Sequence, residues 1–159
     1  MGQLLADLIG KPQGWQIVSS PVGRARATAE IIARKMQGLP IELDDRLKEM
    51  SWGAHDGRLR SELEAEYPET FGKPGWAFEA SSSESYEVVA CRIGDWLASL
   101  PLEPQRRIIA VSHGISGRVL RGIYANQGGD ASAQQDAPQD AVYRLAHGEV
   151  TRIDGEPAN

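Results

Sequence analysis

The chain has 159 residues, of which 41% are hydrophobic, so it is long enough to bury one sizeable core, and we expect a single domain over residues 1–159. A net charge of -5 and a pI near 5.2 argue against a nucleic-acid partner or an anionic membrane surface, because either would require a dominant positive field. The single cysteine, Cys91, excludes an intrachain disulfide, and we expect it to be a buried or half-buried helix residue. Residues 1–10 lack the features of a signal peptide or membrane span, so we expect a cytoplasmic protein.

The first part of the chain has the pattern of a β-α-β unit. Residues 4–9 have the spacing of an amphipathic helix, and a helix this close to the first residue suggests a domain that is incomplete at its N-terminus. An apolar run over residues 15–19 predicts a strand, which is followed by a helix with Pro21 at its first position and Gly38 at its end. Residues 41–43 alternate as a half-exposed strand.

A long excursion follows over residues 51–83, with one short predicted helix at residues 59–66. Its aromatic residues fit a satellite core better than a ligand platform. They are Trp52, Tyr67, Phe71, Trp76 and Phe78.

The last part of the chain returns to regular elements. Val89, Ile93, Trp96 and Leu100 predict an amphipathic helix that begins in the serine-rich stretch 81–85 and stops at Pro101. The apolar run at residues 107–112 predicts a strand buried on both faces. A helix is expected over residues 114–124, with Arg118 and Arg121 on its exposed face. Residues 126–139 are polar and expected to be mobile, and residues 141–153 predict a hairpin with a turn at His147-Gly148.

Polar groups occur where the three predicted parallel strands end, which is where open α/β sheets build their sites. They are Arg24, Glu49 and the tripeptide Ser112-His113-Gly114. In the tripeptide, a glycine turn opens a helix, so backbone N–H groups and the positive end of the helix dipole favour an anion such as phosphate. Two plainer interpretations stay open, namely that Arg24 is a solvated helix cation and that Glu49 is a surface carboxylate.

Three segments resemble motifs of the histidine phosphatase (phosphoglycerate mutase-like) superfamily. Residues 19–30 (SSPVGRARATAE) are similar to its Ser-x-x-x-Arg-Ala-x-x-Thr-Ala segment, and residues 47–53 (LKEMSWG) are similar to its Leu-x-Glu-x-x-Phe-Gly segment. Residues 111–114 (VSHG) resemble its second histidine motif. Weaker matches at residues 84–86 and 139–142 extend the resemblance over nearly the whole chain.

The resemblance implies an α/β fold of three layers, α/β/α, with a mostly parallel sheet whose first strand is missing from this chain. It implies that Arg24 binds phosphoryl oxygens, that Glu49 is the proton donor to the leaving alcohol, and that His113 stabilises charge during transfer. Ser20 and Gly114 lie in the same motifs and are assigned to substrate binding. The implied ligand is a phosphorylated small molecule or inorganic phosphate, and no metal or organic cofactor is implied.

The chain departs from the family at one point, because the Arg-His-Gly tripeptide that carries the nucleophilic histidine does not occur in it. Of its three histidines, His113 belongs to the second motif, His147 falls in the predicted hairpin turn, and His55 is expected to be a loop residue. An active phosphatase with His113 as nucleophile would also lack the family's first arginine.

We therefore expect a phosphomonoester hydrolase or phosphoglycerate mutase-like protein that is inactive as this chain stands. The alternative is a non-catalytic phosphate-binding or interaction module. Translation of the DNA upstream of Met1 would discriminate between them, because an in-frame Arg-His-Gly after a strand favours the first. A vacant first-strand position also leaves sheet edges exposed, and through them the chain could associate with a second copy.

Overall fold

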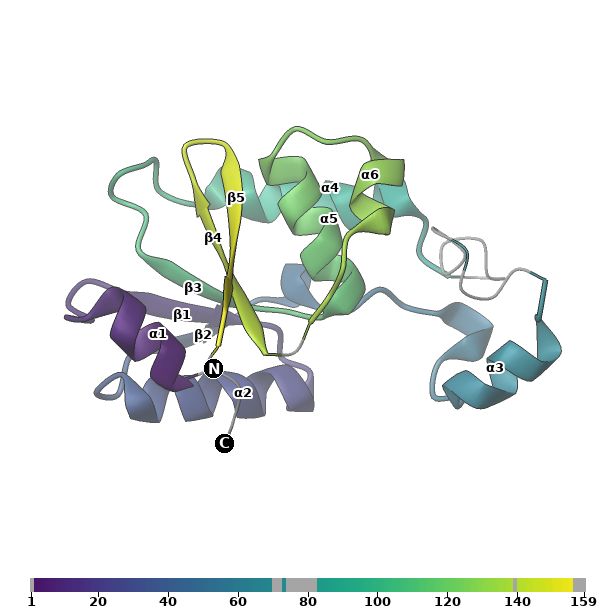
Figure 1. Cartoon of the computed structure of the whole chain (residues 1–159), viewed down its shortest axis with the longest axis horizontal. Helices are drawn as coiled ribbons and strands as arrows, with labels where there is room; N and C mark the ends of the chain where they lie inside the picture. Colours follow the sequence, from purple (N-terminus) through teal and green to yellow (C-terminus); the bar gives the residue numbers. More distant parts are fainter. Residues whose placement is uncertain (1, 70–72, 74–82, 139, 156–159) are drawn as a thin grey trace.

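The central sheet of the protein has three parallel strands in the order β2-β1-β3 (Figure 1). In the computed structural model, which describes residues 2–69, 73, 83–138 and 140–155, the middle strand is β1 (Gln16–Ser19). It pairs on one side with β2 (Ile41–Leu43) and on the other with β3 (Ile108–Val111). Because all three strands run in the same direction, their carboxyl ends share one edge of the sheet.

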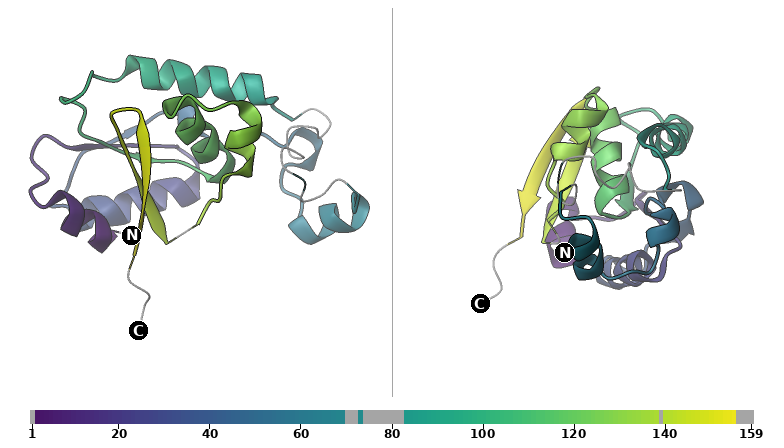
Figure 2. Two further views of the ribbon diagram at one scale, coloured as in Figure 1. Left: turned by 45° about the horizontal axis from the view of Figure 1, so that its top comes forward. Right: turned by 90° about the vertical axis from the view of Figure 1, so that its right-hand side faces the viewer.

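Helices cover both faces of this sheet and give the α/β/α architecture that the family resemblance implies (Figure 2). On one face lie α1 (Gly2–Ile9) and α2 (Gly23–Lys35). On the other lie α4 (Tyr86–Ser99) and α5 (Gly114–Tyr124). Among the described residues, no helix is long and apolar enough to cross a membrane.

The alternation of side chains along β1 divides the core into two clusters. Ile17, which is fully buried, packs with the apolar side of α2, and Val18 packs with α4 and α5 on the opposite face. The helical positions in these clusters follow the predicted periodicity. They are Ala25, Ala29, Ile32, Ala33 and Met36 on and just after α2, Val89, Ile93 and Trp96 on α4, and Val119 and Leu120 on α5.

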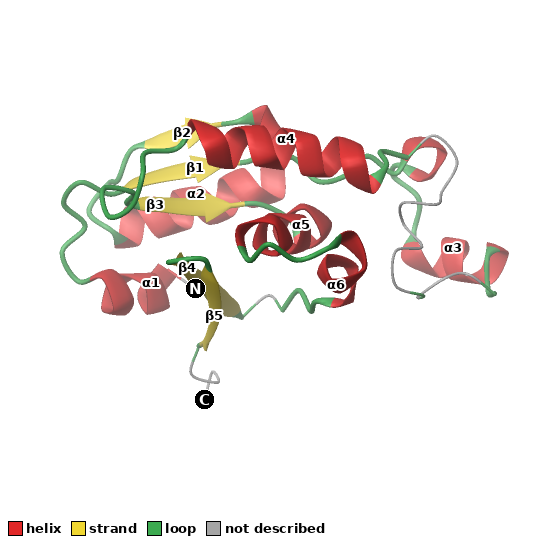
Figure 3. Cartoon of the chain, turned by 90° about the horizontal axis from the view of Figure 1, so that it is seen from above, coloured by secondary structure: helices red, strands yellow, loops and turns green. Residues whose placement is uncertain are grey.

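A second, antiparallel sheet contains only the predicted hairpin, formed by β4 (Ala141–Ala146) and β5 (Glu149–Asp154). Its turn is at His147-Gly148, where both residues have positive φ, as expected for a two-residue hairpin loop. Figure 3 shows β4 and β5 apart from the edge of β3. Within the described residues, no strand pairs with that outer edge of β3.

This open edge explains why β3 departs from the expectation of burial on both faces. Ile109 and Val111 are buried on the side of α2, but Ile108 is only partly covered and Ala110 is exposed. The apolar run therefore predicted the strand correctly but overestimated how much of it is buried.

The excursion after β2 contains two short 3-10 turns, Asp45–Leu47 and Gly53–His55, and α3 (Arg60–Glu66), which stands apart from the sheet layers in Figures 1 and 2. The predicted satellite core is described only in part. Trp52 packs against the core cluster of α4 and α5, and Tyr67 contacts the ring of His55. The other aromatic residues lie outside the described residues; they are Phe71, Trp76 and Phe78.

Two local expectations, at the start of α2 and on α4, need correction. Helix α2 begins at Gly23 with Val22 as its N-cap, so Pro21 precedes the helix, because the Ser20 hydroxyl already accepts the N–H of Val22 in a tight turn. Cys91 is exposed, since it lies two residues from Val89 and so on the opposite side of α4.

The polar segment after α5 also differs from its expectation, because it contains a short helix, α6 (Gly129–Gln134), whose Ser132 is fully buried. Arg121 is buried rather than exposed. Its guanidinium donates to the Gln135 side chain and the Asp136 carbonyl and lies over the ring of Tyr143. Helical spacing, on which the expected exposure of Arg121 rested, did not show that this arginine has partners within the chain.

Candidate active site

The structure places all three predicted polar positions at the carboxyl edge of the sheet. Arg24 lies in the first turn of α2, which follows β1. Glu49 lies in the irregular segment after β2, and His113 is the N-cap of α5, directly after β3. Parallel strand order therefore brings together residues that are far apart in the sequence.

His113 is joined to the turn between β1 and α2 by a hydrogen bond of 2.8 Å between its Nε2 and the Oγ of Ser20. Ser20 is fully buried, and its Oγ also accepts the Val22 N–H at 3.2 Å. The sequence assigns Ser20 to substrate binding. In the structure the Ser20 hydroxyl bonds His113, and this hydrogen bond orients the imidazole ring.

Glu49 occupies the N-terminal end of α5. Its Oε1 accepts the N–H groups of Met50 and Ser116, both at 3.1 Å, and its Oε2 accepts the Ile115 N–H at 3.4 Å. The sequence pointed to a phosphate at this helix end, whereas here the protein's own carboxylate binds the first-turn N–H groups. A Cβ at Gly114 would lie 3.8 Å from Glu49 Oε2, so this glycine faces the same carboxylate.

Burial lowers the pKa of the His113 imidazole, the nearby Glu49 carboxylate opposes this, and the charges of Arg24 and Arg92 lower it further. The neutral ring is therefore favoured, with one nitrogen as a donor and the other as an acceptor. Arg24 itself is exposed, so its guanidinium is open to a ligand from solvent.

The other two histidines lie where the sequence puts them. His55 ends a 3-10 turn, is nearly fully buried, and meets Tyr67 edge to face at 5.3 Å between ring centroids. His147 lies in the hairpin turn beside Glu103.

Two residues of the site's surroundings were missed from the sequence, namely Arg92 and Ser116. Ser116 is fully buried in the first turn of α5 and donates its hydroxyl to the Lys48 carbonyl at 2.6 Å. Arg92 bonds the carbonyls of the same segment. A signal for Arg92 was present, because it lies between Val89 and Trp96 on the apolar side of α4, where a charged residue needs a partner.

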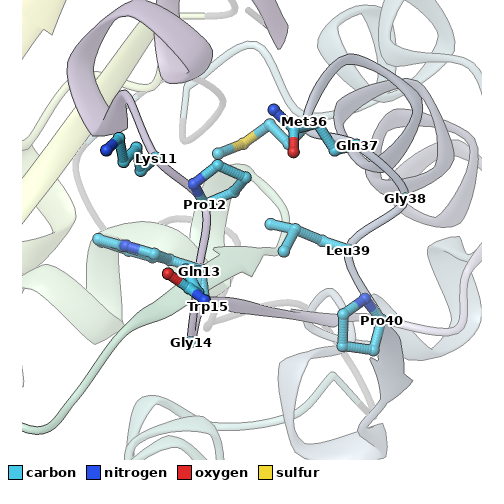
Figure 4. Close-up of a pocket in the computed structure, with 10 residues that line it drawn as sticks. All are labelled: Lys11, Pro12, Gln13, Gly14, Trp15, Met36, Gln37, Gly38, Leu39 and Pro40. Atoms are coloured by element: carbon cyan, nitrogen blue, oxygen red, sulfur yellow. The ribbon is translucent and has the colours of Figure 1, made fainter.

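An open hollow of about 470 Å³ lies elsewhere, between residues 11–15 and 36–40 (Figure 4). Both segments precede strands, so the hollow is at the amino edge of the sheet, opposite Glu49 and His113. Among the described residues that line it, Lys11 is the one that carries a charge. Within the described part of the chain, no group of three or more His, Cys, Asp or Glu side chains could hold a metal ion.

The fold and the placement of Arg24, Glu49 and His113 define an α/β/α protein with a histidine, a carboxylate and an arginine at the carboxyl edge of its sheet. The sequence matches a model of the histidine phosphatase superfamily (branch 1) over residues 2–152. The chain belongs to this superfamily.

Two curated relatives, both named glucosyl-3-phosphoglycerate phosphatase, come from strains of Mycobacterium tuberculosis. Each is 31% identical to this chain over 122 residues, which cover 69% of this chain and 53% of the relative. The chain thus spans about half the length of the curated relatives it matches.

Solved structures agree on the fold. Bacillus stearothermophilus YhfR aligns with a TM-score of 0.72 and 19% identity, over 99% of this chain and 81% of that one. A putative alpha-ribazole-5'-P phosphatase from Escherichia coli aligns with a TM-score of 0.71 and 20% identity, over 96% and 78%. "Mycobacterial hydrolase 1" aligns with a TM-score of 0.63 and 26% identity, over 85% and 70%.

Proposed function

We propose that this chain carries the half of a phosphomonoesterase site that binds the phosphoryl group and protonates the leaving alcohol. The observation that supports this most directly is the meeting of Glu49 and His113 at the N-terminal end of α5. Arg24, exposed at the same edge, supplies a guanidinium suited to bidentate contact with phosphoryl oxygens.

In this proposal each residue has one task. Arg24 binds two phosphoryl oxygens, and the neutral His113 donates a hydrogen bond to a third oxygen. In a complete site the family's nucleophilic histidine, which this sequence lacks, would accept the phosphoryl group as the P–O ester bond breaks, and Glu49 would pass a proton to the departing alkoxide, which leaves as an alcohol. The backbone N–H of Gly114 lies beside His113 and adds a donor for the substrate.

The ligand we propose is a phosphorylated small molecule, with inorganic phosphate as the product that remains. The name of the curated relatives, glucosyl-3-phosphoglycerate phosphatase, supports a phosphate ester of a small alcohol as the substrate class. The net charge of -5 disfavours nucleic acid and anionic membranes as partners, and together with the single cysteine it fits our proposal of a cytoplasmic protein.

We further propose that the 159 residues alone do not turn over a phosphomonoester. The nucleophile that the family uses lies in an Arg-His-Gly tripeptide, which is absent from this sequence. The second candidate function, a non-catalytic phosphate-binding or interaction module, is favoured by the same absence. It is also favoured by the Glu49 carboxylate, whose two oxygens already accept backbone N–H groups.

Titration with inorganic phosphate, followed by 31P and amide NMR, tests the binding half of the proposal. Arg24→Ala and His113→Ala should each weaken phosphate binding. Arg34→Ala removes an exposed cation at the other end of α2 and should leave binding unchanged. Equal effects of Arg24→Ala and Arg34→Ala would show only nonspecific attraction of the anion.

Hydrolysis of p-nitrophenyl phosphate tests the catalytic half. We expect no turnover by the chain alone. A rate that disappears in His113→Ala, or a stable phosphohistidine on this chain, would contradict the proposal.

A further inference from the structure

The segment that carries Glu49 has no regular secondary structure of its own. Residues 48–52 follow a 3-10 turn and precede another, so no helix or strand ladder fixes the backbone on either side of the carboxylate. Its position must come from other contacts, because a coil of this kind has many conformations of similar energy. The side chains that bond its backbone therefore determine where Glu49 lies.

Several of these contacts involve Arg92 on α4, directly or through Glu84. Its Nη1 donates to the carbonyl oxygens of Arg46 at 2.7 Å and Lys48 at 2.8 Å, which lie just before Glu49 in the chain. Its Nε and Nη2 each donate to Glu84 at 3.1 Å in a bidentate pair. One guanidinium thus joins α4 to the backbone that leads into Glu49.

Glu84 extends the same connection to the other side of Glu49. Its Oε2 accepts the N–H of Ser51 at 2.8 Å, and its own N–H donates to the Ser51 carbonyl at 3.0 Å. The Arg92–Glu84 pair therefore holds the coil both before and after Glu49.

Ser116 closes the network on the side of α5. Its hydroxyl donates to the Lys48 carbonyl at 2.6 Å, and its N–H donates to Glu49 Oε1 at 3.1 Å. Arg92 Nη2 lies 3.4 Å from the Ser116 hydroxyl, so the guanidinium, the coil and the end of α5 meet at one place. With side-chain exposures of 17% for Arg92 and 24% for Glu84, the pair is shielded enough from water to hold a fixed geometry.

We propose that Arg92, held by Glu84, is a positioning residue that keeps the Glu49 carboxylate against the N-terminal end of α5 beside His113. The proposal deepens the proposed function and rests on it for its meaning in catalysis, because Glu49 is the proton donor assigned there. The contacts themselves do not depend on that assignment. Arg92 is not expected to touch substrate, since its donors are used by Glu84 and by backbone carbonyls.

The amide resonances of Ile115 and Ser116 provide a direct test in the 159-residue chain. Glu49→Gln should shift both resonances in the wild-type background, because both N–H groups donate to the Glu49 carboxylate, and we call this shift the amide response. In an Arg92→Met background, Glu49→Gln should shift neither resonance, because the carboxylate no longer lies against the end of α5.

Arg121→Met is the matched control. Arg121 is also a shielded arginine that bonds a backbone carbonyl, that of Asp136, but it does so on the far part of α5. The control variant should lose stability and keep the response of Ile115 and Ser116 to Glu49. If it lost the response as Arg92→Met does, the effect would be one of general loosening and the proposal would fail.

Two milder variants keep the test decisive if Arg92→Met does not fold. Arg92→Lys retains the charge but cannot span Glu84 and two carbonyls at once, and Glu84→Gln weakens the bidentate pair. Both should reduce the amide response. A full response in Arg92→Lys would show that charge alone suffices and would overturn the proposal.

Phosphate titration of the same samples separates this proposal from the proposed function. Wild-type chain that shows the amide response but binds no phosphate would contradict the function and leave the positioning role supported. The opposite result is phosphate binding through Arg24 and His113 with an amide response that is unchanged in Arg92→Met. This result would support the function and overturn the positioning role.

Discussion

His113 has a pKa that burial lowers, and this has a consequence for stability as a function of pH. The unfolded chain binds a proton at this histidine near its ordinary pKa of about 6.5, whereas the folded chain does so only at lower pH. As the pH falls below that ordinary value, the unfolded state binds more protons than the folded state, so stability falls. The loss levels off once the pH has passed below the lowered pKa of the folded state.

The prediction is therefore a decrease in the free energy of unfolding below about pH 6.5 that is smaller in His113→Asn. Urea denaturation of both proteins at a series of pH values measures it. Asp44 and Asp136 are carboxylates with lowered pKa values, so the stability that they contribute is lost at more acidic pH. This loss is the same in the wild type and in His113→Asn. A constant difference between the two curves would contradict the prediction.

Ser20→Ala tests the contact beneath the imidazole. The hydroxyl is fully buried and has two partners, the His113 Nε2 and the Val22 N–H, so its removal leaves polar groups unpaired in the interior. We expect a loss of about 1–3 kcal/mol in the free energy of unfolding. Thr28→Ala is the control, because its hydroxyl bonds the Arg24 carbonyl at the exposed helix surface and should change stability by less than about 0.5 kcal/mol.

At the scale of single residues, the sequence predicted where the candidate site residues lie in the fold better than it predicted their contacts. Motif spacing placed Arg24, Glu49 and His113 at one edge of the sheet, because strand order in an α/β unit follows from the chain. It could not show that the end of α5 is occupied by Glu49 or that Ser20 faces His113. Such contacts depend on how two loops meet in space, and no local pattern encodes that distance.

At the scale of elements, two glycines within helices differ in how closely other atoms approach them. Gly94 on α4 has open space around the position of a Cβ, so Gly94→Ala should stabilise the protein by about 0.5–1 kcal/mol through helix propensity. Gly122 on α5 faces α6, and a Cβ there would lie 1.8 Å from Ser132 Oγ and 2.8 Å from its Cβ. Gly122→Ala should therefore destabilise by about 1–3 kcal/mol despite the same gain in propensity.

Thermal unfolding of the two variants measures this contrast. Gly122→Ala should also change the amide resonances of α6, because that helix must move away from α5 to admit the methyl group. Stabilisation by both substitutions would show that α6 does not pack closely against Gly122 in solution.

The order of the elements was predictable from the sequence because each has its own periodicity and end signals. The β-α-β unit, the helix capped by Ser85 and the terminal hairpin were all predicted correctly. The short helix α6 was missed, since residues 126–139 contain few apolar residues and the helix is held by the packing of Ser132 on Gly122. An element that depends on a tertiary contact between small residues leaves no periodic signal.

At the scale of the whole molecule, the two sheets leave the outer edge of β3 without a paired strand among the described residues. In parallel pairing, alternate residues direct their N–H and C=O groups to the same neighbour. The carbonyls of Arg107 and Val111 accept N–H groups from the segment of β1. Because the direction alternates along the strand, the N–H and C=O groups of Ile108 and Ala110 point to the open edge. An edge of this kind favours pairing with another strand.

We propose that this edge allows two copies of the chain to associate, and Ala110→Pro provides the test. Proline removes the outward N–H of an exposed residue and leaves the bonds of its neighbours to β1 in place, so association should weaken while the sheet persists. Ala110→Ser, which keeps the N–H at a similar side-chain size, is the matched control and should associate as the wild type does. Sedimentation velocity over a range of concentrations measures the association, and circular dichroism confirms that each variant is folded. A wild-type chain that remains monomeric at every concentration, or an Ala110→Pro variant that associates as strongly as Ala110→Ser, would show that the edge of β3 is not the contact.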